Sequence, residues 1–305
     1  MRMSRRNAKL LRTIITLLLL AVLAAGGYLY SSAEHGYSTG VSGNLQTEGT
    51  LVVNYLDVGQ GDSEFIQLPD GKCILIDAGV SDSADKIAEK IRELGCEKID
   101  YLVATHPHAD HIGGMQKIVE GFEIGEIYMP RASTDTRTFE KLLEAISAKG
   151  LSINTAKAGK VLYNANDLRI EFIAPTSSAY KDLNNYSAVI RLQYGENVFL
   201  FMGDAEKTSE NEILDNYSGS VLDADVLKVG HHGSNTASTA AFINAVTPDY
   251  AVIEVGVDNS YHHPHEEAVN NLNAVGAQIL RTDLNGDIAI VSDKTSITVY
   301  CEKDQ

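Results

Sequence analysis

The sequence has few cysteines, and this shortage excludes several classes of protein. It contains three, Cys73, Cys96 and Cys301, in 305 residues, which is too few for a disulfide framework, and none has zinc-knuckle spacing. No cysteine closely follows the apolar run near the N-terminus, which argues against a lipoprotein. We therefore expect three isolated structural thiols.

Basic residues are also scarce, 25 against 41 acidic ones. Five of them precede Glu34, the first acidic residue, so the rest of the chain carries 20 basic and 41 acidic residues, a formal charge of −21. Such a surface repels polyanions and gives no long-range steering toward nucleic acid. The content of 44% hydrophobic and 22% charged residues is that of an ordinary globular protein.

The first thirty residues differ from the rest. A basic segment ending at Arg12 precedes an uncharged apolar run from Thr13 to Tyr30, about the minimum span of a bilayer. This pattern predicts a signal-anchor helix in residues 1–30, a single pass through the cell membrane, with the domain on the extracytoplasmic side. The alternative is secretion after signal cleavage near Ala24 and Ala25. Residues 31–50 predict a flexible linker, and residues 51–305 a folded domain.

Short β-branched runs alternate with amphipathic helical patterns along that domain. Predicted helices include Ser83–Leu94, Thr138–Ala148, Lys207–Tyr217, Ser238–Ala245 and Glu266–Ala274; predicted strands include Leu51–Asp57, Cys73–Asp77, Tyr101–Thr105, Val198–Met202, Ala224–Val229 and Tyr250–Val255. Hairpins and β–α units are mixed, which favours an α/β fold with two mixed sheets between helix layers.

The strongest chemical pattern is the run from Thr105 to His111, directly after an apolar strand. It places four side chains that zinc and its first-row neighbours prefer within six residues: His106, His108, Asp110 and His111. Histidines crowded on one turn would repel when protonated and gain little otherwise, so a purely structural role is disfavoured.

The order H-x-H-x-D-H after a strand resembles the signature of the metallo-β-lactamase superfamily. This resemblance implies an αββα sandwich in which His106 and His108 hold one metal and Asp110 and His111 a second. It also implies two divalent ions, zinc or manganese.

Other positions match the same family. Asp77 resembles the carboxylate that orients the histidine loop from behind, although an aspartate at a turn has the same sequence pattern. Asp204, after the strand 198–202, resembles the aspartate that bridges the metals. His231 is the expected last ligand because it comes first after a buried strand, and His232 remains an alternative.

One position departs from the family pattern. Where many members place a third histidine on the first metal, this chain has the segment Asp182–Ser187, which contains none. Asn184, Asn185 or water could complete that metal, or the ion could be manganese, for which oxygen ligands are more suitable.

The combined motifs resemble one branch of the superfamily, the hydrolase domain of ComEC-type competence DNA-uptake proteins, without their channel. The matching motifs are residues 56–63, the histidine loop, Asn184–Ser187, Gly203–Asp204, Val229–Ser234 and Tyr261–His265. The resemblance suggests that Asp62, Asn185, His232 and Ser234 lie near the metals or the substrate. His263 would contact a phosphate or relay a proton; a surface histidine and a plain glycine turn around Asp62 are the alternatives.

The resulting hypothesis is a phosphodiesterase or nuclease acting on DNA, in which Asp110 and Asp204 orient the attacking water and His231 or His263 assists the leaving group. The first alternative is a hydrolase of a carboxylic ester, lactone or β-lactam. The second is a non-catalytic metal-binding scaffold, which would have no need of six convergent ligands.

Overall fold

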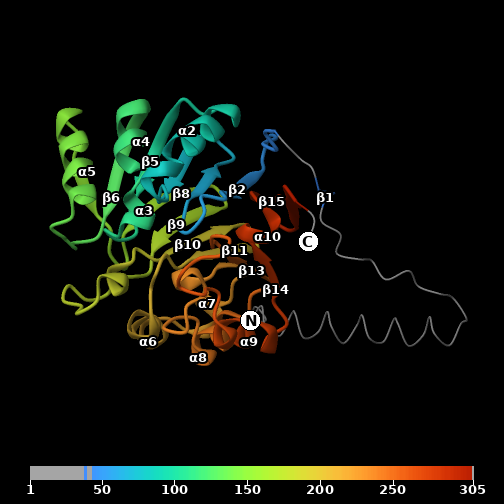
Figure 1. Ribbon diagram of the computed structural model, residues 1–305. Helices are drawn as coiled ribbons and strands as arrows, with labels where there is room; N and C mark the ends of the chain where they lie inside the picture. The colour runs from blue at the N-terminus through green and yellow to red at the C-terminus, as the bar shows by residue number, and fades with distance from the viewer. Residues whose placement is uncertain (1–37, 40–42, 304–305) are drawn as a thin grey trace, which may run out of the picture.

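A computed structural model describes residues 38–39 and 43–303 (Figure 1). The predicted signal-anchor helix, residues 1–30, and the first part of the predicted linker lie outside the described residues, so the anchor stays a prediction. In the part of the chain that is described, no helix is both long and apolar enough to cross a bilayer.

Two mixed sheets form the middle of the molecule. The first has the strand order β1-β16-β15-β2-β3-β4-β5-β6-β7 and the second the order β14-β13-β12-β11-β10-β9-β8. The strands of the first sheet are β1 (Ser38–Thr39), β2 (Leu51–Tyr55), β3 (Glu64–Gln67), β4 (Cys73–Ile76), β5 (Lys98–Val103), β6 (Glu123–Met129), β7 (Ile153–Thr155), β15 (Ile288–Ser292) and β16 (Ile297–Cys301). Those of the second are β8 (Val161–Ala165), β9 (Leu168–Phe172), β10 (Ile190–Tyr194), β11 (Asn197–Phe201), β12 (Val226–Lys228), β13 (Tyr250–Ile253) and β14 (Gln278–Arg281).

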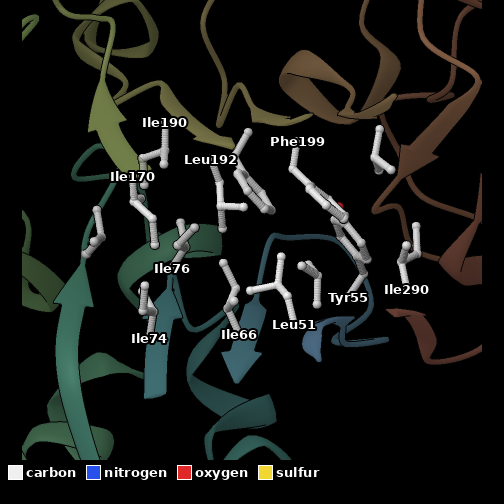
Figure 2. Close-up of a cluster of buried hydrophobic side chains, with 14 of the residues drawn as sticks. Leu51, Tyr55, Ile66, Ile74, Ile76, Ile170, Ile190, Leu192, Phe199 and Ile290 are labelled. Carbon is white, nitrogen blue, oxygen red and sulfur yellow. The ribbon is translucent and has the colours of Figure 1, made fainter. Parts of the chain in front are cut away.

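The main hydrophobic core lies between the sheets. In β9 the alternate residues Leu168, Ile170 and Phe172 point into this core, while Arg169 and Glu171 form an ion pair on the other face. Figure 2 shows side chains of the first sheet, such as Leu51 and Ile66, facing those of the second, such as Leu192 and Phe199. The period-two pattern of these strands therefore produces the inter-sheet core.

Helices cover the outer face of each sheet (Figure 1). The first sheet is covered by α2 (Ala84–Glu93), α4 (Met115–Gly121) and α5 (Arg137–Ala148), and the second by α6 (Lys207–Asn216), α7 (Gly219–Leu222), α8 (Ala240–Val246) and α9 (Glu266–Ala274). In α2 the buried residues Ala84, Ile87, Ala88 and Ile91 recur at helical spacing, which gives one apolar face. The predicted four-layer α/β sandwich is confirmed.

Strands β4 to β7 run parallel to one another, as do β11 to β14. The carboxyl ends of parallel strands share one edge of a sheet, which is where ligands bind in open α/β folds. The loops after β4, β5, β11 and β12 can therefore meet. Strands β6, β7 and β8 were not predicted from the sequence, and the first two of them extend this edge.

The folded unit begins before Leu51, which corrects the prediction of a flexible linker up to residue 50. Asn44 Nδ2 donates to the carbonyl of Leu94 at 2.7 Å, and Gln46 Nε2 donates to the carbonyl of Thr50 at 2.8 Å. Ser38 and Thr39 pair with β16 in parallel. Residues 43–50 are thus held against the domain by side-chain amides, which composition alone did not indicate.

A disulfide joins Cys73 and Cys96, so the prediction of three isolated thiols is wrong for these two. Cys73 begins β4, and Cys96 lies two residues before β5. These strands are parallel neighbours joined through α2, so the start of β4 and the turn before β5 lie at the same end of the sheet, and the Cα atoms of the two cysteines are 6.9 Å apart although 23 positions separate them. Cys301 is a buried thiol, as expected.

Candidate metal centre

The histidine loop follows β5 and ends in a short helix, α3 (Ala109–Ile112). His106 and His108 precede this helix, whereas Asp110 and His111 lie within it. His106 and His111 are fully buried, and His108 and Asp110 are partly exposed. The backbone changes from extended to helical inside the motif. This change lets neighbouring side chains point toward two adjacent candidate metal sites.

Two clusters of possible metal ligands meet at Asp204. In the first cluster, atoms of His106, His108 and Asp204 all lie within 4.8 Å of one another. In the second cluster, the same holds for atoms of Asp110, His111, Asp204 and His232. The two oxygens of Asp204 divide between them: Oδ2 lies 3.6 Å from His106 Nε2, and Oδ1 lies 3.3 Å from His111 Nε2.

The second cluster has the chemistry that a cation requires. His111 Nε2, Asp204 Oδ1 and His232 Nε2 are buried and have no hydrogen-bond partner among the described residues. Each such atom costs about 1–3 kcal/mol when left unpaired. Burial raises the pKa of Asp204, but the adjacent rings of His111 and His232 bring it well below its usual range, so the carboxylate stays charged. Imidazole and carboxylate donors of this kind fit zinc or manganese.

Asp77 lies behind the histidine loop, directly after β4. Its Oδ1 accepts a hydrogen bond from the backbone N–H of Thr105 at 2.8 Å, and its Oδ2 lies 2.7 Å from His111 Nδ1. An acceptor at Nδ1 keeps the proton on that nitrogen and leaves Nε2 free. Asp77 therefore has the contacts expected of a residue that orients the loop.

Asp62 lies beside the ring of His232, the other histidine of the second cluster. Its Oδ1 lies 3.1 Å from His232 Nδ1, which is also 2.9 Å from the carbonyl oxygen of Glu254. The backbone N–H of Asp62 donates to the carbonyl of Asp110 at 3.2 Å, and a side chain on the preceding Gly61, at φ +148°, would collide with that carbonyl. The glycine here allows close packing against the histidine loop.

A buried lysine, Lys228, forms an ion pair with Asp62. Its role was not identified from the sequence. Its ammonium lies 2.5 Å from Asp62 Oδ2, and both side chains are fully buried. Carboxylate oxygens of Asp62, Glu64 and Glu254 lie within 4.8 Å of one another around it. Burial lowers the pKa of Lys228, but these carboxylates more than offset that effect and raise it. The feature of the sequence that could have indicated this role is a charged residue inside the buried strand β12.

The structure places His232, and not the expected His231, in the second cluster. His232 Nε2 lies 3.4 Å from Asp110 Oδ2 and 3.6 Å from Asp204 Oδ1. Both histidines have left-handed backbone angles, with φ values of 50° and 54°, and this tight turn sends their rings in different directions. His231 is 22% exposed and contacts Glu206, with 3.3 Å between Nδ1 and Oε1. Order along the chain could not reveal that turn.

A comparison with protein families matches residues 56–256 to the model of the metallo-beta-lactamase superfamily. The chain belongs to the metallo-β-lactamase superfamily. It is accordingly a metallo-hydrolase by fold and family, and its paired His and Asp clusters indicate that it binds divalent metal.

Curated relatives include two competence proteins. ComE operon protein 3 of Bacillus subtilis is 33% identical over 261 residues, which cover 80% of this chain and 33% of that protein. Competence protein ComA of Neisseria gonorrhoeae is 31% identical over 240 residues, which cover 78% of this chain and 32% of that protein. The chain thus spans about a third of the length of these relatives. The resemblance to the ComEC branch is confirmed.

A solved structure with the same fold is CmlA, a diiron β-hydroxylase from Streptomyces venezuelae. It aligns with a TM-score of 0.50 at 14% identity, over 77% of this chain and 53% of that one. At this identity the likeness shows the fold alone.

The segment that was expected to stand in place of a third histidine forms a 3-10 helix, Leu183–Tyr186. Asn185 does not face the clusters, because its Nδ2 donates to Glu206 at 3.2 Å and its Oδ1 accepts from the N–H of Ser209 at 3.0 Å. The residue after the helix, Ser187, lies closer: its Oγ is 3.4 Å from His106 Nδ1 and accepts from the N–H of Asp204. Glu206, which was not identified from the sequence, contacts both Asn185 of this segment and His231.

His263 lies beside His231 and His232, and Ser234 lies in the loop that follows these two histidines. The ring of His263 lies 5.5 Å from that of His231 and 6.3 Å from that of His232. Burial, followed by the charges of these two histidines, lowers the pKa of His263 to about 4, so the ring is neutral at pH 7. Ser234 shapes the loop, since its N–H donates to the carbonyl of His231 at 2.8 Å.

Proposed function

We propose that the chain is a metal-dependent phosphodiesterase that acts on nucleic acid, with DNA as the leading substrate. The observation that carries the proposal is the pair of adjacent clusters sharing Asp204, because two neighbouring divalent ions suit the displacement at a phosphodiester. The similarity to two competence proteins supports nucleic acid as the substrate class.

The roles of the side chains follow from their contacts. When bound, two divalent ions would lower the pKa of water and polarise the ester. Asp77 accepts the Nδ1 proton of His111 and the carbonyl of Glu254 that of His232, with Asp62 beside it, which keeps both Nε2 atoms available as ligands. Asp110 and Asp204 place carboxylate oxygens beside these rings, where they would orient the attacking water.

His263 is the candidate for proton transfer or for contact with the substrate. Its Nδ1 is buried and has no hydrogen-bond partner in the described part of the chain. Because its pKa is lowered to about 4, the neutral ring would accept a proton or a hydrogen bond and would not donate a proton to a leaving group.

The test is hydrolysis by the full chain of single- and double-stranded DNA and of bis-nitrophenyl phosphate, with manganese or zinc, beside an Asp110→Ala variant. We expect turnover of both substrate types with a high apparent KM for DNA, because the formal charge of −21 opposes the approach of a polyanion. Chromogenic lactone and β-lactam substrates are assayed in parallel. Opening of these rings without cleavage of any phosphodiester would replace the proposal with the ester or lactam alternative.

We also propose that the domain acts outside the cytoplasmic membrane. The basic segment before the apolar run supports this orientation, and so does the disulfide between Cys73 and Cys96, since disulfides persist in oxidising compartments. Protease added to intact protoplasts should remove a C-terminal tag. Survival of the tag while an outer-face control is digested would place the domain inside.

A further inference from the structure

Most basic side chains of the domain already have partners. Of the 20 lysine and arginine residues after Glu34, 15 contact a carboxylate, a carbonyl or side-chain oxygen, or an aromatic ring. Within the described residues, five make no ion pair, side-chain hydrogen bond or ring contact: Arg131, Lys141, Lys157, Lys181 and Lys207. All five are exposed. In a chain with 41 acidic residues, cations without a carboxylate partner are unexpected.

Three of these five residues lie on loops at the edge that carries the metal centre, and a fourth, Lys207, is the first residue of α6. Arg131 follows β6, the parallel neighbour of the strand that leads into the histidine loop, and Lys157 follows β7, the next parallel strand. Lys181 lies just before the 3-10 helix that ends at Tyr186, and Lys207 follows Asp204 by three positions. The fifth, Lys141, lies instead in α5, in the outer helix layer. The unpaired cations therefore gather at the edge of the fold that carries the site.

Two of them line a pocket of about 360 Å³. Arg131 and Lys157 share it with the hydroxyl side chains of Thr155, Thr176, Ser177, Ser178 and Tyr186. Tyr186 connects the pocket to the first cluster, because the next residue, Ser187, lies 3.4 Å from His106 Nδ1. Glu212 lies nearby, but its carboxylate accepts hydrogen bonds from the hydroxyls of Thr176 and Tyr180.

Cations and hydroxyl groups together bind phosphate oxygens. One lining residue, Tyr186, is aromatic, and its ring lies 5.0 Å from that of Tyr180 in an edge-to-face arrangement. Aromatic rings beside a positively charged groove are the usual means of holding single-stranded nucleic acid.

Building on the proposed function, we propose that Arg131 and Lys157 bind a backbone phosphate of a nucleic-acid strand next to the bond that is cleaved. Lys181 and Lys207 extend this positive edge around the metal centre. The cations act locally, since screening limits exposed charges to about 8–10 Å, and the acidic remainder of the surface does not prevent contact. The pocket would thus distinguish a polynucleotide, with several phosphates, from a small diester with one.

The experiment compares the Arg131→Gln/Lys157→Gln double variant with wild type and with Lys141→Gln, which removes an equally unpaired and exposed cation that does not line the pocket. Binding of a fluorescent single-stranded oligonucleotide to the full chain without divalent metal is measured by anisotropy at several salt concentrations. We expect roughly tenfold weaker binding and a salt slope lower by about two for the double variant, one for each lost phosphate contact, and wild-type binding for Lys141→Gln.

Turnover of bis-nitrophenyl phosphate, measured separately with manganese, should be unchanged in the double variant, because this substrate has no second phosphate. If the double variant binds the oligonucleotide as tightly as wild type, or if Lys141→Gln weakens binding equally, the pocket is not a phosphate site. Failure of the proposed function would appear differently, as absence of diester turnover by wild type, and the binding comparison would still decide the role of the two cations.

Discussion

Alanine in place of Asp204 is expected to remove bound metal from both clusters and to lower kcat/KM by about 10³-fold or more, because metal ions contribute several kcal/mol to such reactions. One carboxylate serves both clusters, with Oδ2 beside His106 and Oδ1 beside His111. No other described side chain belongs to both. Metal content of the purified variant, measured by elemental analysis, and hydrolysis of bis-nitrophenyl phosphate are the two measurements.

His231→Ala is the matched control for this prediction. His231 also contacts Asp204, with 3.7 Å between Nε2 and Oδ2, but it lies outside both clusters and is partly exposed. Its metal content should remain near that of wild type. If His231→Ala loses as much metal as Asp204→Ala, the original prediction of His231 as a ligand is restored and His232 is not the last ligand.

Lys228→Met should lower the free energy of unfolding by about 3–5 kcal/mol, the usual effect of removing one partner from a buried ion pair. Its ammonium neutralises Asp62, and oxygens of Glu64 and Glu254 lie close by; burial followed by repulsion from Asp62 already raises the pKa of Glu254 to about 8. Metal affinity should also fall, because Asp62 holds His232. Urea denaturation and metal titration measure the two effects.

Lys294→Met serves as the control, since Lys294 pairs with Asp167 at 3.1 Å on the surface. Exposed pairs of this kind contribute about 0–1 kcal/mol. Equal destabilisation by the two variants would show that Lys228 has no special role. If Lys228→Met does not fold, Lys228→Arg provides the second comparison: it keeps the charge and should retain most of the stability lost in the methionine variant.

Local sequence patterns were sufficient to predict that the residues of the histidine loop meet at the centre of the candidate site. His106, His108, Asp110 and His111 lie within six residues, so their convergence needs only one loop, and the sequence displays this short-range order directly. Asp204 follows an apolar strand, but its place between the clusters was predicted by resemblance. The positions of Asp77 behind the loop and of Asp62 near the clusters were predicted by resemblance, and the structure places both there.

Features that depend on long-range contacts were missed. Strand β6 contains Gly125 and exposed glutamates, which hide its pattern, yet a side chain at Gly125 would collide with the backbone of Asp100 in the adjacent strand. The Cys73–Cys96 bond depends on the pairing of β4 with β5. The choice between His231 and His232 depends on two left-handed residues in succession, which no propensity scale indicates.

Strand β4 is fixed at both of its ends. A disulfide holds Cys73 at its start, and Asp77, directly after its end, is bound to Thr105 and His111. This short segment therefore connects the disulfide at the start of the strand to Asp77 at its end, which contacts the candidate ligand His111. Groups that are already in place lose little conformational freedom when a cation arrives, so more of the coordination energy remains as affinity. In this sense the disulfide preorganises the metal centre from the far end of a single strand.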